Sequence, residues 1–250
     1  MNLLKCISLL LLLGIPGDLL RADWNPKYLP YDSAYTLTVL KDPKLGALEN
    51  RVFQYLTNSW CTQEKAKLLM ELVAITHPQV CVEIGAFTGS STLPILAALQ
   101  YLEEGRAYVI EAWSNQEAIK GLPLNDPNTA WWGSLDMGAL KNQFLSMIQT
   151  WSLPSTYQLL HMTSQQAISQ VPEINFLLLD GNCSEEGSLV DSELYVSKVV
   201  PGGYVLLANV LVTIGGKATK MRALLPLFEQ CDIICEIDKG NALLFRKKQS

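Results

Sequence analysis

Short apolar runs alternate with longer amphipathic stretches along most of the chain. The runs are continuous rather than alternating, which is typical of strands buried on both faces of a parallel sheet. They cover residues 80–84, 107–111, 156–161, 174–180, 203–208, 231–237 and 241–246. Helical stretches lie between or after them, near residues 90–103, 136–151, 164–170, 186–199 and 218–229. This order predicts an α/β fold with a doubly wound, mostly parallel sheet of seven strands.

The two ends of this region are expected to differ from its centre. The last two runs are joined by Asp238-Lys239-Gly240, a tight turn, so they should pair as an antiparallel hairpin at one edge of the sheet. Residues 46–76 have the apolar spacing of helices, and residues 23–45 indicate an irregular lead-in. We therefore expect one domain over residues 23–250, in which residues 23–78 form an N-terminal helical lid on an α/β core at 79–250.

The first 22 residues have a pattern of their own. Lys5 precedes an apolar run from Cys6 to Ile15, which is too short to cross a bilayer, since that takes about 20 residues. A charged start, a short apolar run and a turn at Pro16-Gly17 resemble a secretory signal peptide. The alternative is a retained apolar helix packed on the domain, which would leave the protein in the cytoplasm.

Composition excludes several classes of protein. Of the 250 residues 49% are apolar and 17% are charged, and the net charge is −5. This excludes intrinsic disorder and argues against a dedicated nucleic-acid surface, which needs clustered Lys and Arg. The two histidines, His77 and His161, nearly exclude a site built of several histidines, and the six cysteines show no C-x-x-C spacing for zinc.

The loop after the first predicted strand carries the first candidate chemistry. Gly85 and Gly89 form a G-x-x-x-G pattern where ligands of open α/β sheets bind. The middle glycine of the dinucleotide fingerprint, which admits a pyrophosphate, is replaced by Phe87, so a ligand without phosphates is favoured over NAD. Glu111 lies 26 residues after Gly85, at the end of the next strand, where an acid can bind both hydroxyls of a ribose.

These motifs resemble a known family. The stretch VEIGAFTGSSTLPILAALQ is similar to the first motif of class I S-adenosylmethionine-dependent methyltransferases, which have a Rossmann-like fold, and especially to the small-molecule O-methyltransferases of the catechol and caffeoyl-CoA type. The similarity continues through VIEAW, MTSQQAI and LLLDGNCSEEGSLVDSELYVSKVVPGGYVLLANV, and covers roughly residues 46–248. It implies S-adenosylmethionine as cofactor and O-methylation of a small-molecule hydroxyl.

The resemblance also assigns roles by position. It places the methionine part of the cofactor on the first loop, the ribose on Glu111, and the adenine near Ser164 and Gln165. Asp180, after the fourth strand, lies beside the sulfonium and the acceptor, where a carboxylate suits a cationic cofactor. The residues of the first loop implied in cofactor binding are Glu83, Gly85, Phe87, Gly89 and Ser90.

The sequence departs from the family at the positions that would bind a metal ion or act as the catalytic base. Metal-dependent relatives hold Mg²⁺ with two aspartates and an asparagine, but here the fifth strand ends Leu207-Ala208-Asn209-Val210 and lacks the second aspartate. A histidine of one related branch is Cys183 here, and the lysine of the catechol type has no counterpart in Gly181-Asn182-Cys183-Ser184. We therefore expect no metal. Asp180 and His161 are the main candidates for a catalytic base, with Glu185 as a third.

Several alternatives stay open. A non-catalytic protein of this fold, which binds the cofactor or a small ligand without turnover, would also lack these groups, whereas an NAD-dependent oxidoreductase is disfavoured by Phe87. The tryptophan-rich segment 113–135 either shapes a pocket for a flat acceptor or is only anchored by aromatic packing. The expected partner is a small-molecule acceptor, without nucleic acid or a stable membrane span, and a homodimer is left open.

Overall fold

The computed structural model describes residues 24–56, 60–153 and 155–249. The signal-peptide prediction for residues 1–22 lies outside these ranges. Within them, no helix combines the length and the apolar character that crossing a membrane requires.

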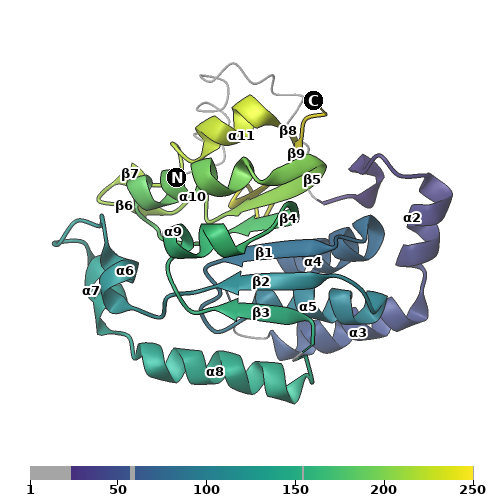
Figure 1. The fold of residues 1–250 in the computed structure, drawn as a ribbon, viewed down its shortest axis with the longest axis horizontal. Helices are drawn as coiled ribbons and strands as arrows, with labels where there is room; N and C mark the ends of the chain where they lie inside the picture. Colours follow the sequence, from purple (N-terminus) through teal and green to yellow (C-terminus); the bar gives the residue numbers. More distant parts are fainter. Residues whose placement is uncertain (1–23, 57–59, 154, 250) are drawn as a thin grey trace.

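A seven-stranded sheet forms the centre of the molecule (Figure 1). Its order is β3-β2-β1-β4-β5-β9-β8, and all pairings from β3 to β5 are parallel. The predicted fold class is therefore confirmed. The strands are β1 (Val80–Ile84), β2 (Arg106–Ile110), β3 (Tyr157–Leu160), β4 (Ile174–Leu179), β5 (Val199–Ala208), β8 (Cys231–Ile237) and β9 (Ala242–Lys247).

The predicted hairpin forms one edge of the sheet. β9 pairs antiparallel with both β5 and β8, so β8 runs in the same direction as β5. Asp238, Lys239 and Gly240 all have positive φ, as a tight reversal between twisted strands requires. The fifth strand is longer than predicted, because Pro201 and the two glycines after it extend the strand through a register shift instead of ending it.

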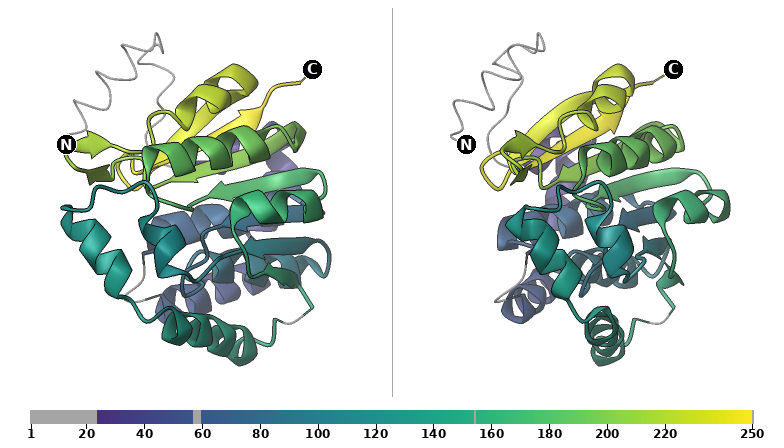
Figure 2. Two further views of the ribbon diagram at one scale, coloured as in Figure 1. Left: turned by 60° about the vertical axis from the view of Figure 1, so that its left-hand side comes forward. Right: turned by 90° about the vertical axis from the view of Figure 1, so that its left-hand side faces the viewer.

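Helices cover both faces of the twisted sheet (Figure 2). One buried cluster packs α3 (Pro43–Tyr55), α4 (Gln63–Thr76), α5 (Thr92–Leu102) and α8 (Met137–Thr150) against the first face. A second cluster packs α9 (Ser164–Ala167), α10 (Glu185–Val196) and α11 (Leu224–Gln230) against the other. The helices change faces after β3, because the chain winds outward from β1 to β3 and then returns to place β4 beside β1.

The N-terminal segment is more regular than its sequence suggests. The predicted irregular lead-in contains a 3-10 turn, η2 (Pro26–Tyr28), and a helix, α2 (Ser33–Leu40). Helix α3 begins at Pro43, before the predicted start, because the Asp42 side chain accepts a hydrogen bond from the Lys44 N–H and proline suits the first helical position. These caps are local signals, and the apolar spacing does not reveal them.

The insertion after β2 is helical rather than a bare loop. It folds as α6 (Asn115–Ile119) and α7 (Pro127–Ser134), which stand beyond the ends of the strands (Figure 1). Asp126 caps α7 and also accepts from the Gly215 N–H at 2.7 Å, which ties the insertion to a short hairpin of β6 (Thr213–Ile214) and β7 (Lys217–Ala218). This hairpin takes up the start of the helix predicted over 218–229, so α11 begins later.

Candidate functional site

The site lies where the sheet changes its winding direction, between β1 and β4. The loops that follow these two neighbouring strands touch at Gly85, which has φ +90°. A Cβ on Gly85 would lie 2.2 Å from the backbone oxygen of Asp180. Glycine therefore allows both the backbone conformation and the close approach of the two loops. This is the position at which open α/β sheets bind ligands.

Glu83 supports the first loop from below. Its side chain is buried, and its two carboxylate oxygens each accept a hydrogen bond at 2.5 Å, one from the Ser91 hydroxyl and one from the Thr92 hydroxyl. Both hydroxyls lie at the start of α5, so Glu83 fixes the helix to the end of β1. Burial raises the pKa of Glu83 to about 7, and the two hydroxyl donors oppose this rise.

This raised pKa predicts a pH dependence of stability. The folded protein holds the Glu83 proton more tightly than the unfolded chain, so this contribution is present at acidic pH and is lost as the pH rises through about 7. The difference from the ordinary value of 4.5 corresponds to about 3 kcal/mol. The free energy of unfolding, measured with urea, should fall between about pH 5 and about pH 8 by about 2 kcal/mol more for wild type than for Glu83→Gln. The glutamine has no titrating group but keeps a hydrogen-bond acceptor. The same pH dependence in both proteins would contradict this role.

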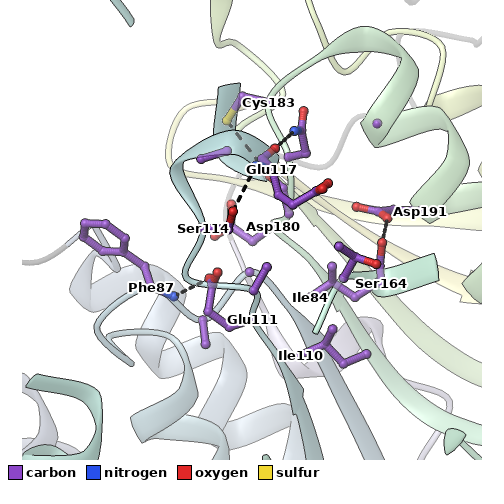
Figure 3. A pocket seen from close by; sticks show the side chains of 18 of the residues that line it. Ile84, Phe87, Ile110, Glu111, Ser114, Glu117, Ser164, Asp180, Cys183 and Asp191 are labelled. Carbon is purple, nitrogen blue, oxygen red and sulfur yellow. Dashed lines mark hydrogen bonds between the residues drawn. The ribbon is translucent and has the colours of Figure 1, made fainter. Parts of the chain in front are cut away.

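Glu111 holds the loops after β1 and β2 together. Its Oε2 accepts from the Phe87 N–H at 3.0 Å, and its Oε1 accepts from the Trp113 N–H at 2.9 Å. The Trp113 indole donates to the Phe87 carbonyl, also at 2.9 Å. Figure 3 shows the Glu111 carboxylate beside the Phe87 nitrogen, with the phenyl ring turned away from it.

The predicted adenine region lies across the pocket, at the start of α9. Ser164 and Gln165 both line the pocket, and the Ser164 hydroxyl hydrogen-bonds to Asp191 of α10 (Figure 3). The Tyr195 hydroxyl donates to the Ser164 carbonyl at 2.6 Å and fixes the turn. Burial raises the pKa of Asp191 to about 6. Asp191 is a pocket residue that the sequence analysis did not identify.

Asp180 is partly buried at the carboxyl end of β4. The Asn209 amide, at the end of β5, donates to its Oδ1. The Lys65 ammonium, at the start of α4, lies 3.9 Å from its Oδ2. Burial raises the pKa of Asp180, while Lys65, Lys220 and the Asn209 hydrogen bond lower it. The structure thus adds Lys65, from a distant part of the chain, to the predicted site.

These residues do not fit a divalent metal ion. Asp180 has no second carboxylate beside it at the end of β5, where Ala208 and Asn209 stand, and the Lys65 ammonium lies 3.9 Å from its Oδ2. Asn182 points elsewhere, because its amide donates to the carbonyls of Glu117 and Lys120 at 2.7 and 3.3 Å. Mg²⁺ is normally held by several oxygen ligands with net negative charge. The described part of the chain holds no cluster of three or more His, Cys, Asp or Glu suited to a metal.

The other candidates for a base lie in different surroundings. His161 does not line the pocket: its two ring nitrogens face the Lys141 ammonium at 3.0 Å and the Ala112 carbonyl at 3.1 Å. Glu185 lies in the first turn of α10 and is not a lining residue either. Cys183 is not a base candidate but stands where one related branch has a histidine; it lines the pocket, and burial raises the pKa of its thiol and so disfavours a nucleophilic thiolate.

An aromatic cluster forms the mouth of the pocket. Trp60 stacks on Phe87 with ring centroids 5.0 Å apart and planes 4° from parallel. Trp131 and Trp132 of α7 pack against Trp60 at 5.4 and 5.8 Å. Trp132 and Trp113 both line the pocket, and Trp113 is also buried and anchors the insertion through its indole hydrogen bond to Phe87. The insertion is thus anchored by aromatic packing and also contributes to the pocket wall, while a flat acceptor stays a prediction.

The pocket enclosed by these loops has a volume of about 260 Å³. Seven of the predicted residues line it: Gly85, Phe87, Ser90, Glu111, Ser164, Gln165 and Asp180. Glu83 lies beneath the loop, Gly89 packs on the side chains of α8, and His161 is outside. Lys65, Trp60 and Asp191 are among the lining residues that had not been predicted.

The fold and the site together define an α/β protein with a pocket at the switch point of its sheet, where ligands bind in open α/β folds. The chain belongs to the methyltransferase domain family, whose profile matches residues 82–210, slightly more than half of its length. This match confirms the resemblance seen in the sequence. A search of curated proteins gives no match.

Solved structures share the fold at low sequence identity. The O-methyltransferase TomG from Streptomyces achromogenes, in complex with SAM, superposes with a TM-score of 0.56 at 15% identity, over 90% of this chain and 98% of TomG. An O-methyltransferase from Bacillus cereus, in complex with SAH, gives 0.52 at 15% identity, over 88% and 93%. The SAH-bound methyltransferase PaMTH1 from Podospora anserina gives 0.53 at 11% identity, over 88% and 98%.

Proposed function

We propose that this protein is an S-adenosylmethionine-dependent methyltransferase that methylates a hydroxyl of a small molecule without a metal ion. The observation that carries the proposal is the convergence of Gly85, Glu111, Ser164 and Asp180 on one pocket at the switch point. Membership of the methyltransferase domain family supports the reaction class. The ligands of TomG and of the Bacillus cereus enzyme, SAM and SAH, support the cofactor.

The pocket has a group suited to bind each part of S-adenosylmethionine. Glu111 would accept hydrogen bonds from the ribose hydroxyls, and the turn at Ser164 and Gln165 would face the adenine. The glycine loop lets the backbone approach the methionine part. Asp180 would lie beside the positive charge of the sulfonium. S-adenosylmethionine supplies an activated methyl group, so the protein has mainly to position the acceptor and manage its proton.

The proposed acceptor side of the pocket has aromatic side chains at its mouth. Trp60, Phe87 and Trp132 provide flat apolar surfaces at its mouth, and Lys65, Cys61 and Asp180 line its interior. Aromatic faces bind flat rings by offset stacking or edge contacts. The donor set around Asp180 contains an ammonium in place of a second carboxylate, which supports a reaction without Mg²⁺.

Two measurements test the proposal. Titration calorimetry should detect binding of both S-adenosylmethionine and S-adenosylhomocysteine. Transfer of a labelled methyl group to a panel of aromatic and aliphatic hydroxyl compounds should then proceed at the same rate with EDTA as with added Mg²⁺. Failure of both cofactors to bind would overturn the proposal, and a rate abolished by EDTA would overturn its metal-independent part. Binding of both without methylation of any acceptor would identify a non-catalytic ligand-binding protein.

A further inference from the structure

Lys65 is buried on the apolar side of its helix. Its side chain is 2% exposed, and it precedes Leu68, Leu69 and Leu72 at helical spacing, all of which are buried. Lys67, two positions on, is 53% exposed and pairs with Glu71 in the ordinary way for a surface lysine. Burying a charged group is costly unless another group compensates it. The position of Lys65 therefore calls for a specific partner.

Asp180 is the charged partner of Lys65, but it does not accept a hydrogen bond from it. Asp180 Oδ2 lies 3.9 Å from the Lys65 Nζ, which is a charge contact too long for a hydrogen bond. Asp180 Oδ1 already accepts from the Asn209 amide. Within the described ranges of the chain, the structure gives Lys65 Nζ no hydrogen bond, and the side chain lines the pocket. Its N–H donors are thus available to a molecule bound there.

A second buried lysine in the same region shows the contrast. Lys220 is 1% exposed, and its Nζ lies 3.3 Å from the carbonyl of Asn182 and 3.5 Å from that of Gly181. It holds the loop after β4 and does not line the pocket. Of these two lysines, Lys65 is the one that lines the pocket.

We propose that Lys65 binds the acceptor oxygen and stabilises it as an oxyanion, so that no metal ion is needed for this role. This inference rests on the proposed methyltransferase function and identifies how that function works without a metal. A fixed ammonium in a pocket shielded from water stabilises a developing negative charge strongly. Helix α4 thus contributes a group that contacts the substrate, besides covering the sheet.

The charges balance through the step. The acceptor hydroxyl gives its proton to the Asp180 carboxylate, and the negative charge moves from Asp180 to the acceptor oxygen, while Lys65 faces both. The oxygen then forms a bond to the methyl carbon as the carbon–sulfur bond breaks, and the electron pair of that bond stays on sulfur. The products are a methyl ether and a neutral thioether, S-adenosylhomocysteine. The proton on Asp180 returns to solvent after product release.

A series of substituted phenols of graded acidity tests the role of Lys65. With 4-methoxyphenol, which holds its proton strongly, Lys65→Met should lower kcat/KM by about 100-fold, the typical effect of removing one donor to an oxyanion. With 4-nitrophenol, which ionises readily, the loss should be much smaller. Lys65→Arg should retain an intermediate rate, and Lys67→Met, on the exposed side of the same helix, should behave as wild type. A purely structural role would lower the rates of all the phenols equally, and that result would overturn the inference.

A binding measurement separates this inference from the proposed function. When 4-nitrophenol is titrated with protein saturated in S-adenosylhomocysteine, the absorbance of the bound nitrophenolate should increase strongly with wild type and only weakly with Lys65→Met. S-adenosylhomocysteine affinity should be unchanged in the variant, which shows that it is folded. Phenolate binding without any methyl transfer would support the role of Lys65 and contradict the proposed function. Equal phenolate absorbance with both proteins, or none with wild type, would overturn the role of Lys65.

Discussion

Replacing Gly85 by alanine is expected to destabilise the protein by about 3 to 5 kcal/mol, the range of severe single substitutions. The added Cβ would lie 2.2 Å from the Asp180 carbonyl oxygen, 2.6 Å from its carbon and 2.9 Å from the Gly181 Cα. All three are backbone atoms, so no side chain can rotate away, and the loops after β1 and β4 have to separate. Urea unfolding followed by circular dichroism measures the loss, and calorimetry should show that S-adenosylhomocysteine no longer binds.

Two other glycines separate steric clash from backbone strain. Gly216 has φ +76° and no atom within 4 Å of an added Cβ, so Gly216→Ala should cost only about 1 kcal/mol of backbone strain. Gly46 lies inside α3 with open space around it, so Gly46→Ala should stabilise the protein by about 0.5 to 1 kcal/mol. If Gly85→Ala cost no more than Gly216→Ala, the two loops would not be in contact as described.

Glu111→Gln is expected to weaken S-adenosylhomocysteine binding by about 100-fold, since hydrogen bonds to a charged group contribute about 1.5 to 3 kcal/mol each. The substitution removes the charge and turns one acceptor into a donor, which also opposes the Phe87 or Trp113 N–H. Calorimetry measures the affinity. Glu104→Gln, on an exposed glutamate paired with His77, is the matched control and should bind as wild type.

A ligand lacking the ribose hydroxyls distinguishes a direct role of Glu111 from loop support. A deoxyribose analogue of S-adenosylhomocysteine should bind wild type more weakly than the parent compound, whereas Glu111→Gln should hardly discriminate between the two. If the variant bound both compounds more weakly by the same factor, Glu111 would act by holding the Phe87 loop and not by binding the ribose.

The sheet could be predicted because its strands are buried on both faces. Continuous apolar runs such as residues 174–180 have few alternative explanations, and the helices between them set the parallel order. The errors lie where local capping decides the structure. Asp32 and Asp42 start helices in a segment that its prolines and tyrosines made look irregular, and Ser114 and Asp126 do the same in the insertion.

The site could be predicted only where it follows the strands. Gly85, Glu111 and Asp180 come directly after β1, β2 and β4, so the topology alone brings them to one edge. Lys65 and Asp191 come from helices, and their place in the pocket depends on how those helices pack. A single sequence signal could have found Lys65, because it is a charged residue on the otherwise apolar stripe of its helix.

The pocket is built from two stretches of chain that are separate in sequence. The cofactor side comes from the loops after β1, β2 and β4, all within residues 82–210, the region by which the family is recognised. Lys65 and Trp60, on the proposed acceptor side, precede that region. Under the proposed function, acceptor choice can therefore change during evolution by substitutions in the N-terminal segment, with the family signature intact. Relatives with the same signature should accordingly be sorted by the residue at position 65 before they are assigned a common acceptor.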